Sequence, residues 1–135
     1  MNQRGFATLE VILMVMVIGI LASIAVPRFT SVTTAANTAK IQADLTTIDT
    51  AISIYYMEHG EYPKNFPSDL SNYLQDSANI KPPVGKAYYK SGDTISELTI
   101  TNGTNYSFKE VNSETRAVLS DHTAGEFTVQ KTAKE

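Results

Sequence analysis

The most extended pattern in this chain is an apolar run near its start. The run from Phe6 to Val26 has 21 residues, of which only Thr8, Glu10 and Ser23 are polar. A helix of 21 residues rises about 31 Å, close to the roughly 30 Å hydrocarbon core of a bilayer. The run therefore predicts a helix that can span a membrane.

Glu10 interrupts this run, and an ionised carboxylate inside a membrane span is energetically unfavourable. An acidic side chain at mid-bilayer costs about 2.5 to 3.5 kcal/mol on insertion scales, and less near an interface. An acid inside a span is therefore a candidate functional group whose partner has to be found. The alternative is an acid in the first helical turn, at headgroup level, that the helix dipole favours.

Pro27 ends the apolar run without ending the predicted helix. A proline removes the hydrogen bond to the carbonyl four residues back, here that of Ser23, so a kink or a locally loosened backbone is expected. Gly19 shares this face and lowers helix stability by about 1 kcal/mol relative to alanine. The segment from Gly19 to Pro27 is thus predicted to be the weakest part of the helix. Close helix packing through its small residues is the alternative.

After Arg28 the pattern becomes amphipathic and predicts a continuation of the same helix. Apolar residues recur at alternating intervals of four and three, while Lys40, Asp44 and Asp49 fall off the stripe. The stripe consists of Ile41, Leu45, Ile48, Ile52 and Tyr55. Gly60 provides a C-terminal cap for a helix of about fifty residues in all.

A proline-rich stretch and then a change of period follow the helix. Within residues 60–83, the segment Ser68 to Leu74 predicts a short helix capped by Ser68, with Leu70, Tyr73 and Leu74 facing inward. From Val84 onward the period is two, which predicts strands at 86–90, 95–101, 105–111, 115–120 and 126–131. An antiparallel sheet packed on the helix stripe gives an α+β fold.

The pair Asn102-Gly103 invites a two-residue hairpin, but the side-chain period argues against it. That register would set Thr99 opposite Tyr106 and leave Leu98 and Ile100 on the other face. An odd loop instead pairs Ile100 with Tyr106 and Leu98 with Phe108. We therefore expect the following residues to cover the helix stripe: Leu98, Ile100, Tyr106, Phe108, Phe127 and Val129.

Composition narrows the classes of function. The 135 residues suffice for one small domain and a long helix. The formal charge of -3 does not indicate a surface that binds nucleic acid. The chain has no cysteine, which excludes a disulfide, a thiol nucleophile and a zinc-cysteine site. His59 and His122 have no partner set in the sequence, and phosphate-binding loops and serine elbows are absent. We therefore predict no catalytic residue and no cofactor.

Two weaker signals lie in the C-terminal half. Asp121 and Glu126 flank a glycine-containing loop that could take a calcium ion, but their spacing matches no loop motif, so no metal is predicted. Asn102-Gly103-Thr104 and Asn105-Tyr106-Ser107 fit the glycosylation sequon, at positions that a hairpin would need anyway.

The residues around the start of the apolar run resemble one known family. In order they are Gly5, Phe6, Thr8, Leu9 and Glu10, followed by Gly19-Ile20-Leu21-Ala22 and Pro27. This order resembles the start of type IV prepilins and of the pseudopilins of type II secretion, over residues 5–29 in detail and over the rest in general architecture. Ala7-Thr8-Leu9 stands where the family commonly has Thr-Leu-Ile.

The resemblance implies a processing step and a fibre. A membrane prepilin peptidase would cut between Gly5 and Phe6 and methylate the new N-terminal Phe6, which makes Glu10 the fifth residue of the mature chain. It also implies that the segment from Gly19 to Pro27 can melt into extended chain when the fibre is stretched.

Cleavage before Phe6 would give Glu10 its partner. The new ammonium lies one helical turn from Glu10, within reach of its own carboxylate or of that of another copy. A charge pair costs the membrane far less than either charge alone. A subunit that leaves the bilayer for a helical bundle would therefore neutralise its Glu10 with the amino terminus of the next subunit, which sets the axial register of assembly.

Together with the resemblance, these patterns divide the chain into a leader at 1–5, a membrane and assembly helix at 6–27, an amphipathic helix half at 28–59 and a globular region at 60–135. The function that the resemblance implies is that of a structural, non-enzymatic subunit of a type IV pilus, a homo-oligomeric helical filament. The expected partners are the prepilin peptidase and the pilus assembly machinery. The precursor would lie in the cytoplasmic membrane as a single-pass protein, and the subunit would then move to the cell surface.

Three alternatives stay open from the sequence. The chain resembles pseudopilins of a type II secretion system or a competence pilus as well as pilins. In the second alternative the helix is only a tether for an extracytoplasmic binding domain or enzyme. A tether would have no need of Glu10. Ordinary secretion with cleavage near Ser23-Ile24-Ala25 is the third alternative, and Glu10 within the apolar region argues against it.

Overall fold

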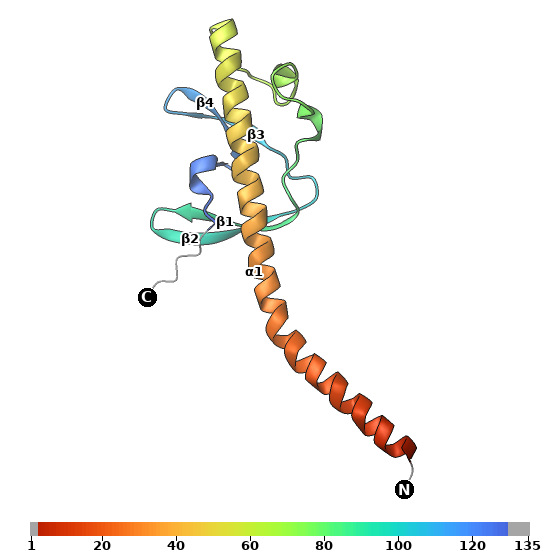
Figure 1. The fold of residues 1–135 in the computed structure, drawn as a ribbon. Coiled ribbons are helices and arrows are strands. Elements are labelled where there is room, and N and C mark those ends of the chain that lie inside the picture. Colours follow the sequence, from red (N-terminus) through yellow and green to blue (C-terminus); the bar gives the residue numbers. More distant parts are fainter. Residues whose placement is uncertain (1–2, 130–135) are drawn as a thin grey trace. The chain divides into compact units, whose positions relative to one another are not determined.

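The computed structural model describes residues 3–129, and its first element is one long helix (Figure 1). Helix α1 (Gln3–His59) has 57 residues and continues through Pro27. It ends where the sequence predicts, because Gly60 has a φ of 73° and its amide donates a hydrogen bond of 2.8 Å to the carbonyl of Tyr56. The chain divides between Thr33 and Thr34 into two compact units, which we call the helical unit and the globular unit.

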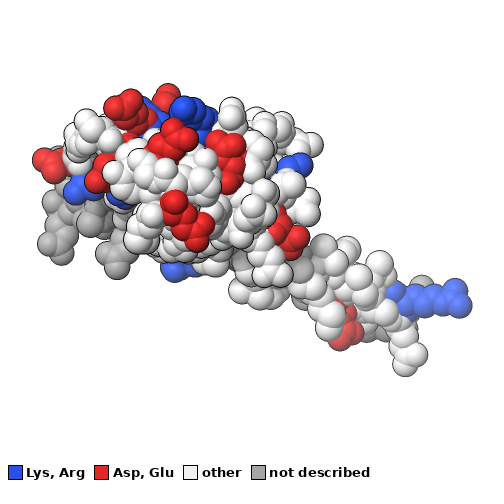
Figure 2. All heavy atoms as spheres, turned by 90° about the horizontal axis from the view of Figure 1, so that it is seen from above, with Lys and Arg blue, Asp and Glu red and all other residues white. Residues whose placement is uncertain are grey.

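The helical unit is an apolar helix with its side chains exposed. The large apolar side chains from Phe6 to Val32 are each 55 to 70% exposed, and none of the most apolar stretch is buried inside the described structure. The helix is long and apolar enough to cross a membrane, with a mean hydropathy of 2.7 over that stretch. In Figure 2 the visible part of this helix is largely free of charge, whereas acidic and basic side chains are interspersed over the globular unit.

The globular unit is built on the apolar stripe of α1. Ile41, Leu45 and Ile48 are fully buried, Ile52 is nearly so, and Tyr55 packs against them partly buried, so the predicted stripe is confirmed. The connection after the helix adds Leu70 and Leu74 to this core, also as predicted.

Five strands complete the unit, and they form two antiparallel sheets instead of the expected single one. The first sheet pairs β1 (Gly85–Ser91) with β2 (Thr94–Ile100), and the second has the order β3-β4-β5, with β3 (Ser107–Val111), β4 (Glu114–Leu119) and β5 (His122–Thr123). Figure 1 shows β1 and β2 lying across the second half of α1. The α+β class, with a small antiparallel sheet structure beside one long helix, is confirmed.

The expected pairing of the second and third strands is wrong. Leu98 pairs with Ala87 on β1, and Phe108 pairs with Ala117 on β4. The side-chain period can select a register only for two strands that pair, and each of these strands instead closes a tight hairpin with its other neighbour. Even so, Ile100 and Tyr106 are buried in the core and Leu98 and Phe108 pack against it.

Two expectations for the C-terminal end of the described chain also need correction. The segment predicted as a strand at 126–131 contributes only the bridge between Phe127 and Tyr89, after the short 3₁₀ helix η3 (Ala124–Glu126), and residues 130–131 lie outside the described range. Phe127 is buried, but Val129 is 43% exposed and lies outside the core. A capping box between Thr123 and Glu126 starts η3 and so ends strand geometry there.

The predicted helix from Ser68 is a single 3₁₀ turn, η1 (Ser68–Leu70), and a second such turn, η2 (Ser77–Asn79), follows it. Ser68 is not its cap. Asp69 stabilises the turn instead, because its Oδ2 accepts hydrogen bonds from the amides of Lys64 at 2.8 Å and Asn65 at 2.9 Å.

Candidate assembly site on the helical unit

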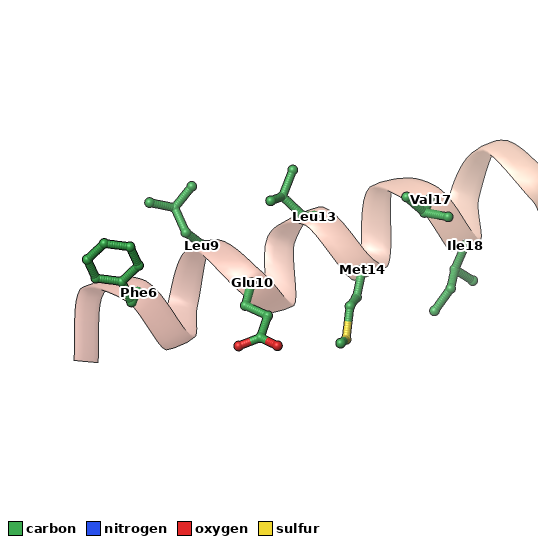
Figure 3. Close-up of a pocket in the computed structure, with 7 residues that line it drawn as sticks. All are labelled: Phe6, Leu9, Glu10, Leu13, Met14, Val17 and Ile18. Carbon is green, nitrogen blue, oxygen red and sulfur yellow. The ribbon is translucent and has the colours of Figure 1, made fainter. Parts of the chain in front are cut away.

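The candidate site is a shallow groove on the surface of α1 that contains Glu10. Its lining residues recur every three or four positions, so helix geometry places them along one side of the helix. They are Phe6, Leu9, Glu10, Leu13, Met14, Val17 and Ile18. Figure 3 shows this lining as two rows, with Glu10 and Met14 below the ribbon and Leu9 and Leu13 above it. A carboxylate thus stands in an otherwise apolar surface.

Glu10 is exposed, and the ion pairs between described residues do not involve it. An exposed apolar surface of this length indicates contact with a membrane or with another protein. A carboxylate in such a contact needs a cationic or hydrogen-bonding partner, because burial of an unpaired charge is costly. The groove therefore has the chemistry of a docking surface that also recognises a cation.

Gly5 and Phe6, the residues on either side of the expected cut, lie within the first turns of α1. Thr8 Oγ1 donates a hydrogen bond of 2.6 Å to the carbonyl of Arg4, across the Gly5–Phe6 bond. Both residues are exposed, and a Cβ added at Gly5 would meet no other atom within 4 Å. The cut and the methylation of Phe6 stay predictions.

Gly19 and Pro27 also lie within continuous helix. A Cβ added at Gly19 would contact nothing within 4 Å, so no neighbouring segment of the described chain requires a glycine there. Pro27 has no amide hydrogen, so it cannot donate to the carbonyl of Ser23. The hydroxyl of Ser23 donates a hydrogen bond of 2.7 Å to the carbonyl of Ile20. The flexibility of this segment stays a prediction.

Both histidines make local contacts in the globular unit. The ring of His59 stacks on that of Tyr55 with 4.2 Å between centroids, and its Nδ1 lies 3.1 Å from the Tyr55 carbonyl oxygen. His122 Nδ1 lies 3.4 Å from Oε1 of Glu126, and its ring is 4.0 Å from that of Tyr89. These contacts fit structural roles.

Asp121 and Glu126, the pair weighed for calcium, are engaged separately. Asp121 Oδ1 lies 3.6 Å from Lys109 Nζ, while Glu126 Oε2 accepts a hydrogen bond of 2.6 Å from the amide of Thr123. Burial raises the pKa of Glu126, but the bonds from Thr123 and His122 outweigh it and hold the pKa below its usual value. Across residues 3–129 no group of three or more acidic or histidine side chains gathers to hold a metal ion.

Polar residues of α1 that bind the later part of the globular unit were not identified from the sequence, and three of them accept hydrogen bonds from it. Asp44 Oδ2 accepts a hydrogen bond from the hydroxyl of Tyr106, and Asp49 Oδ1 accepts one from the amide of Ala117 at 2.8 Å. Buried Thr38 accepts one from the amide of Tyr88, also at 2.8 Å. Asp44 and Asp49 directly precede and follow stripe residues, which was the available signal.

The sequence of this chain is similar to the sequences of several known proteins. The chain is 30% identical over 91 residues to the type II secretion system core protein G of Escherichia coli K12. The aligned residues cover 67% of this chain and 61% of that protein. It is 27% identical over 103 residues to a fimbrial protein of Neisseria meningitidis serogroup A, with 71% and 61% covered. It is a homologue of type II secretion pseudopilins and type IV pilins.

A third relative is the type IV major pilin protein PilE1 of Neisseria gonorrhoeae, 27% identical over 101 residues, which cover 75% of this chain and 41% of that protein. The alignments with these three relatives thus span between 41 and 61% of each relative's length. No family model and no solved structure matches the chain. The resemblance read from residues 5–29 is therefore confirmed by homology over a larger part of the chain.

Proposed function

We propose that this chain is a structural subunit of a type IV pilus, a helical filament of its own copies joined through the helical unit. The observation that carries the proposal is Glu10 within the exposed apolar groove of α1. An apolar helix without a charge would serve equally well as a tether. A carboxylate that is costly in lipid favours a state in which a cation neutralises it.

The cation would be the amino terminus of a neighbouring copy. A prepilin peptidase cuts between Gly5 and Phe6 and methylates Phe6, and the new ammonium lies about one turn from Glu10 along the helix. Pairing of Glu10 with the terminus of the next subunit lets the two opposite charges neutralise each other within apolar surroundings, and it fixes the axial step between subunits. The large exposed apolar side chains from Phe6 to Val32 supply the packing surface of the filament core.

The precursor would be held in the cytoplasmic membrane by the span from Phe6 to Val26 until the pilus assembly machinery extracts it. Membrane and filament are alternative surroundings for the same apolar surface. The segment from Gly19 to Pro27 is the place where the helix would loosen in either one. The filament then appears at the cell surface.

A pseudopilus of type II secretion is the second candidate. The 30% identity to a type II secretion system core protein over 67% of this chain favours it. Both candidates use the same docking chemistry, so they differ in where the filament goes. Electron microscopy of sheared surface fibres, with identification of their main band, separates them: long surface fibres made of this chain indicate a pilus.

The deciding experiment replaces Glu10 with glutamine, which keeps the size of the side chain and removes its charge. We expect Glu10→Gln to be cut to a chain that starts at Phe6 and to accumulate in the membrane, while the sheared fibre fraction is lost. The matched control is Glu110→Gln, an exposed acid on β3, which should leave fibre yield unchanged. Wild-type fibre yield in Glu10→Gln would refute the docking role.

Mass spectrometry of the secreted chain tests the processing step separately. A mature N-terminus at methylated Phe6 supports the proposal. An N-terminus at Val26 would indicate ordinary secretion with loss of the whole apolar helix.

A further inference from the structure

We propose that the outer edge of strand β2 is a second docking site, and that its partner is the β2 edge of another copy of this chain carried on a neighbouring filament. This inference rests on the proposed function, because it requires many copies displayed along a fibre. It concerns contacts between filaments, whereas Glu10 concerns contacts within one.

The first observation is that β2 pairs on one side only. Among the described strands β2 has β1 as its single partner, over the whole seven-residue length from Thr94 to Ile100. The opposite edge of β1 is already occupied, because Phe127 bridges to Tyr89 and the amide of Thr128 donates to the carbonyl of Tyr88 at 3.2 Å. Every second residue of an edge strand directs its backbone N–H and C=O outward, which is a template for another strand.

The second observation is that this edge is weakly protected. The sequence of β2, Thr-Ile-Ser-Glu-Leu-Thr-Ile, has no proline or glycine and one charged residue, which is the composition of strands that pair with identical strands. Its single charge, Glu97, lies 2.8 Å from Lys86 of β1. The longer outer strand of the other sheet differs, because two of the five residues of β3, Lys109 and Glu110, are exposed charges. Charges of this kind discourage pairing at an edge.

The geometry of self-pairing selects the register and the partner. An antiparallel contact between two β2 edges has two-fold symmetry. The register that sets Glu97 opposite Glu97 is disfavoured because like charges face each other, whereas a shift by one residue on each strand sets Glu97 opposite Thr99 and Leu98 opposite Leu98. Subunits in one filament are related head to tail and not by a two-fold axis, so the contact joins copies in two different filaments. Repetition along both fibres makes a weak contact effective, and the result is lateral bundling.

The test places a negative charge on the β2 edge without disturbing its own sheet. Thr99 is exposed and lies opposite Lys86 on β1, so glutamate at this position is compatible with the β1–β2 pair. In the shifted register Thr99→Glu faces Glu97 of the other copy. The matched control is Ser107→Glu, an exposed residue on the outer strand of the second sheet.

Purified sheared fibres of each variant are sedimented at low speed, which pellets bundles but not single filaments, and are imaged by electron microscopy. We expect wild-type and Ser107→Glu fibres to bundle, and Thr99→Glu to form as many fibres with at least about threefold less in the pellet, since each unfavourable cross-strand pair is repeated along the fibre. High salt should restore bundling of Thr99→Glu because it screens the repulsion. Single wild-type filaments, or undiminished bundles of Thr99→Glu, would overturn the inference. A wild type without any fibres would instead overturn the proposed function.

A single-cysteine variant supplies a direct readout, because the natural chain has no thiol. Thr99→Cys fibres treated with a short bismaleimide should give a covalent dimer, and Ser107→Cys fibres should not. Equal cross-linking of both variants would show that the contact is not made through β2 and would overturn the inference.

Discussion

The hydroxyl of Tyr106 donates a hydrogen bond of 2.7 Å to Oδ2 of Asp44, a residue 62 positions earlier in the chain. The bond joins the segment before β3 to the helix that carries the core. Burial raises the pKa of Tyr106 above its usual value, and the bond to Asp44 raises it further, so the phenol keeps its proton and acts as a donor at every physiological pH.

Tyr106→Phe should therefore lower the free energy of unfolding of the globular unit. The ring still fills its place in the core, so the expected loss is that of one hydrogen bond to a charged group, about 1.5 to 3 kcal/mol, reduced because Asp44 keeps its pair with Lys40. Urea denaturation of the full chain in detergent measures it. Tyr56→Phe is the control, since that side chain is 43% exposed, and an equal loss there would contradict the role of the Asp44 bond.

Substitution of Asp49 tests a second hydrogen bond, which joins α1 to strand β4. Its Oδ1 accepts from the amide of Ala117, and its Oδ2 lies 3.3 Å from Arg116. Asp49→Ala leaves a buried amide unsatisfied and should cost about 1 to 3 kcal/mol, whereas Asp49→Asn keeps an acceptor and should cost less than about 1 kcal/mol. Equal losses in the two variants would show that the ion pair matters more than the amide.

Asp49 also gives stability a pH dependence of known sign. Burial raises its pKa above the usual 3.8, against the opposing effects of the Ala117 amide and Arg116. The folded state therefore binds the proton more tightly than the unfolded state, and stability falls as pH rises from about 3.8 through the folded pKa. Asp49→Asn should remove this slope from the pH profile of the urea midpoint.

Gly85 at the start of β1 should not tolerate a side chain. It has a φ of 130°, and an added Cβ would lie 2.9 Å from Nδ2 of Asn37, which donates a hydrogen bond to the carbonyl of Lys86. Gly85→Ala should destabilise the globular unit by about 1 to 3 kcal/mol. Gly125→Ala is the control, because that residue has open space around it and no positive φ. Comparable melting of the two variants would contradict this account.

The sequence predicted those parts of the fold that local periodicity determines. The stripe from Ile41 to Tyr55 and the end of α1 at Gly60 follow from residues within a few positions of one another. Strand pairing does not, because Leu98 meets Ala87 through the choice of one hairpin over another. The same holds for Asp44 and Asp49, whose partners are the distant Tyr106 and Ala117.

The candidate site was visible in the sequence for a different reason. A single carboxylate in an apolar run stands out without any knowledge of the fold, and so Glu10 could be identified beforehand. The proposed partner of Glu10 belongs to a second copy, and therefore one chain can show the groove but not the pair.

Asp69 gives a pH dependence of the opposite sign from Asp49. The amide of Asn65, and then that of Lys64, hold its pKa below the usual 3.8. Its contribution to stability is therefore present above pH 3.8 and lost as pH falls through the lower folded pKa. Asp69→Asn should remove this acid-side loss, and the pH profile of the melting temperature measures it. Asp93→Asn in the exposed β1–β2 turn is the control, and an equal change there would argue against the amide bonds as the cause.

Substitution of Pro27 tests the proposed weakness of the helix between Gly19 and Pro27. Proline in a helix interior is about 3 kcal/mol and glycine about 1 kcal/mol less favourable than alanine. Pro27→Ala restores a donor for the Ser23 carbonyl, so amide hydrogen exchange in the turns around it should slow in detergent micelles. If this segment is where the fibre extends, Pro27→Ala fibres should also require more force for the same extension. Val15→Ala, which lies in regular helix, is the control for both measurements. Unchanged exchange and unchanged force in Pro27→Ala would mean that the helix is not weakened at the proline and that extension of the fibre begins elsewhere.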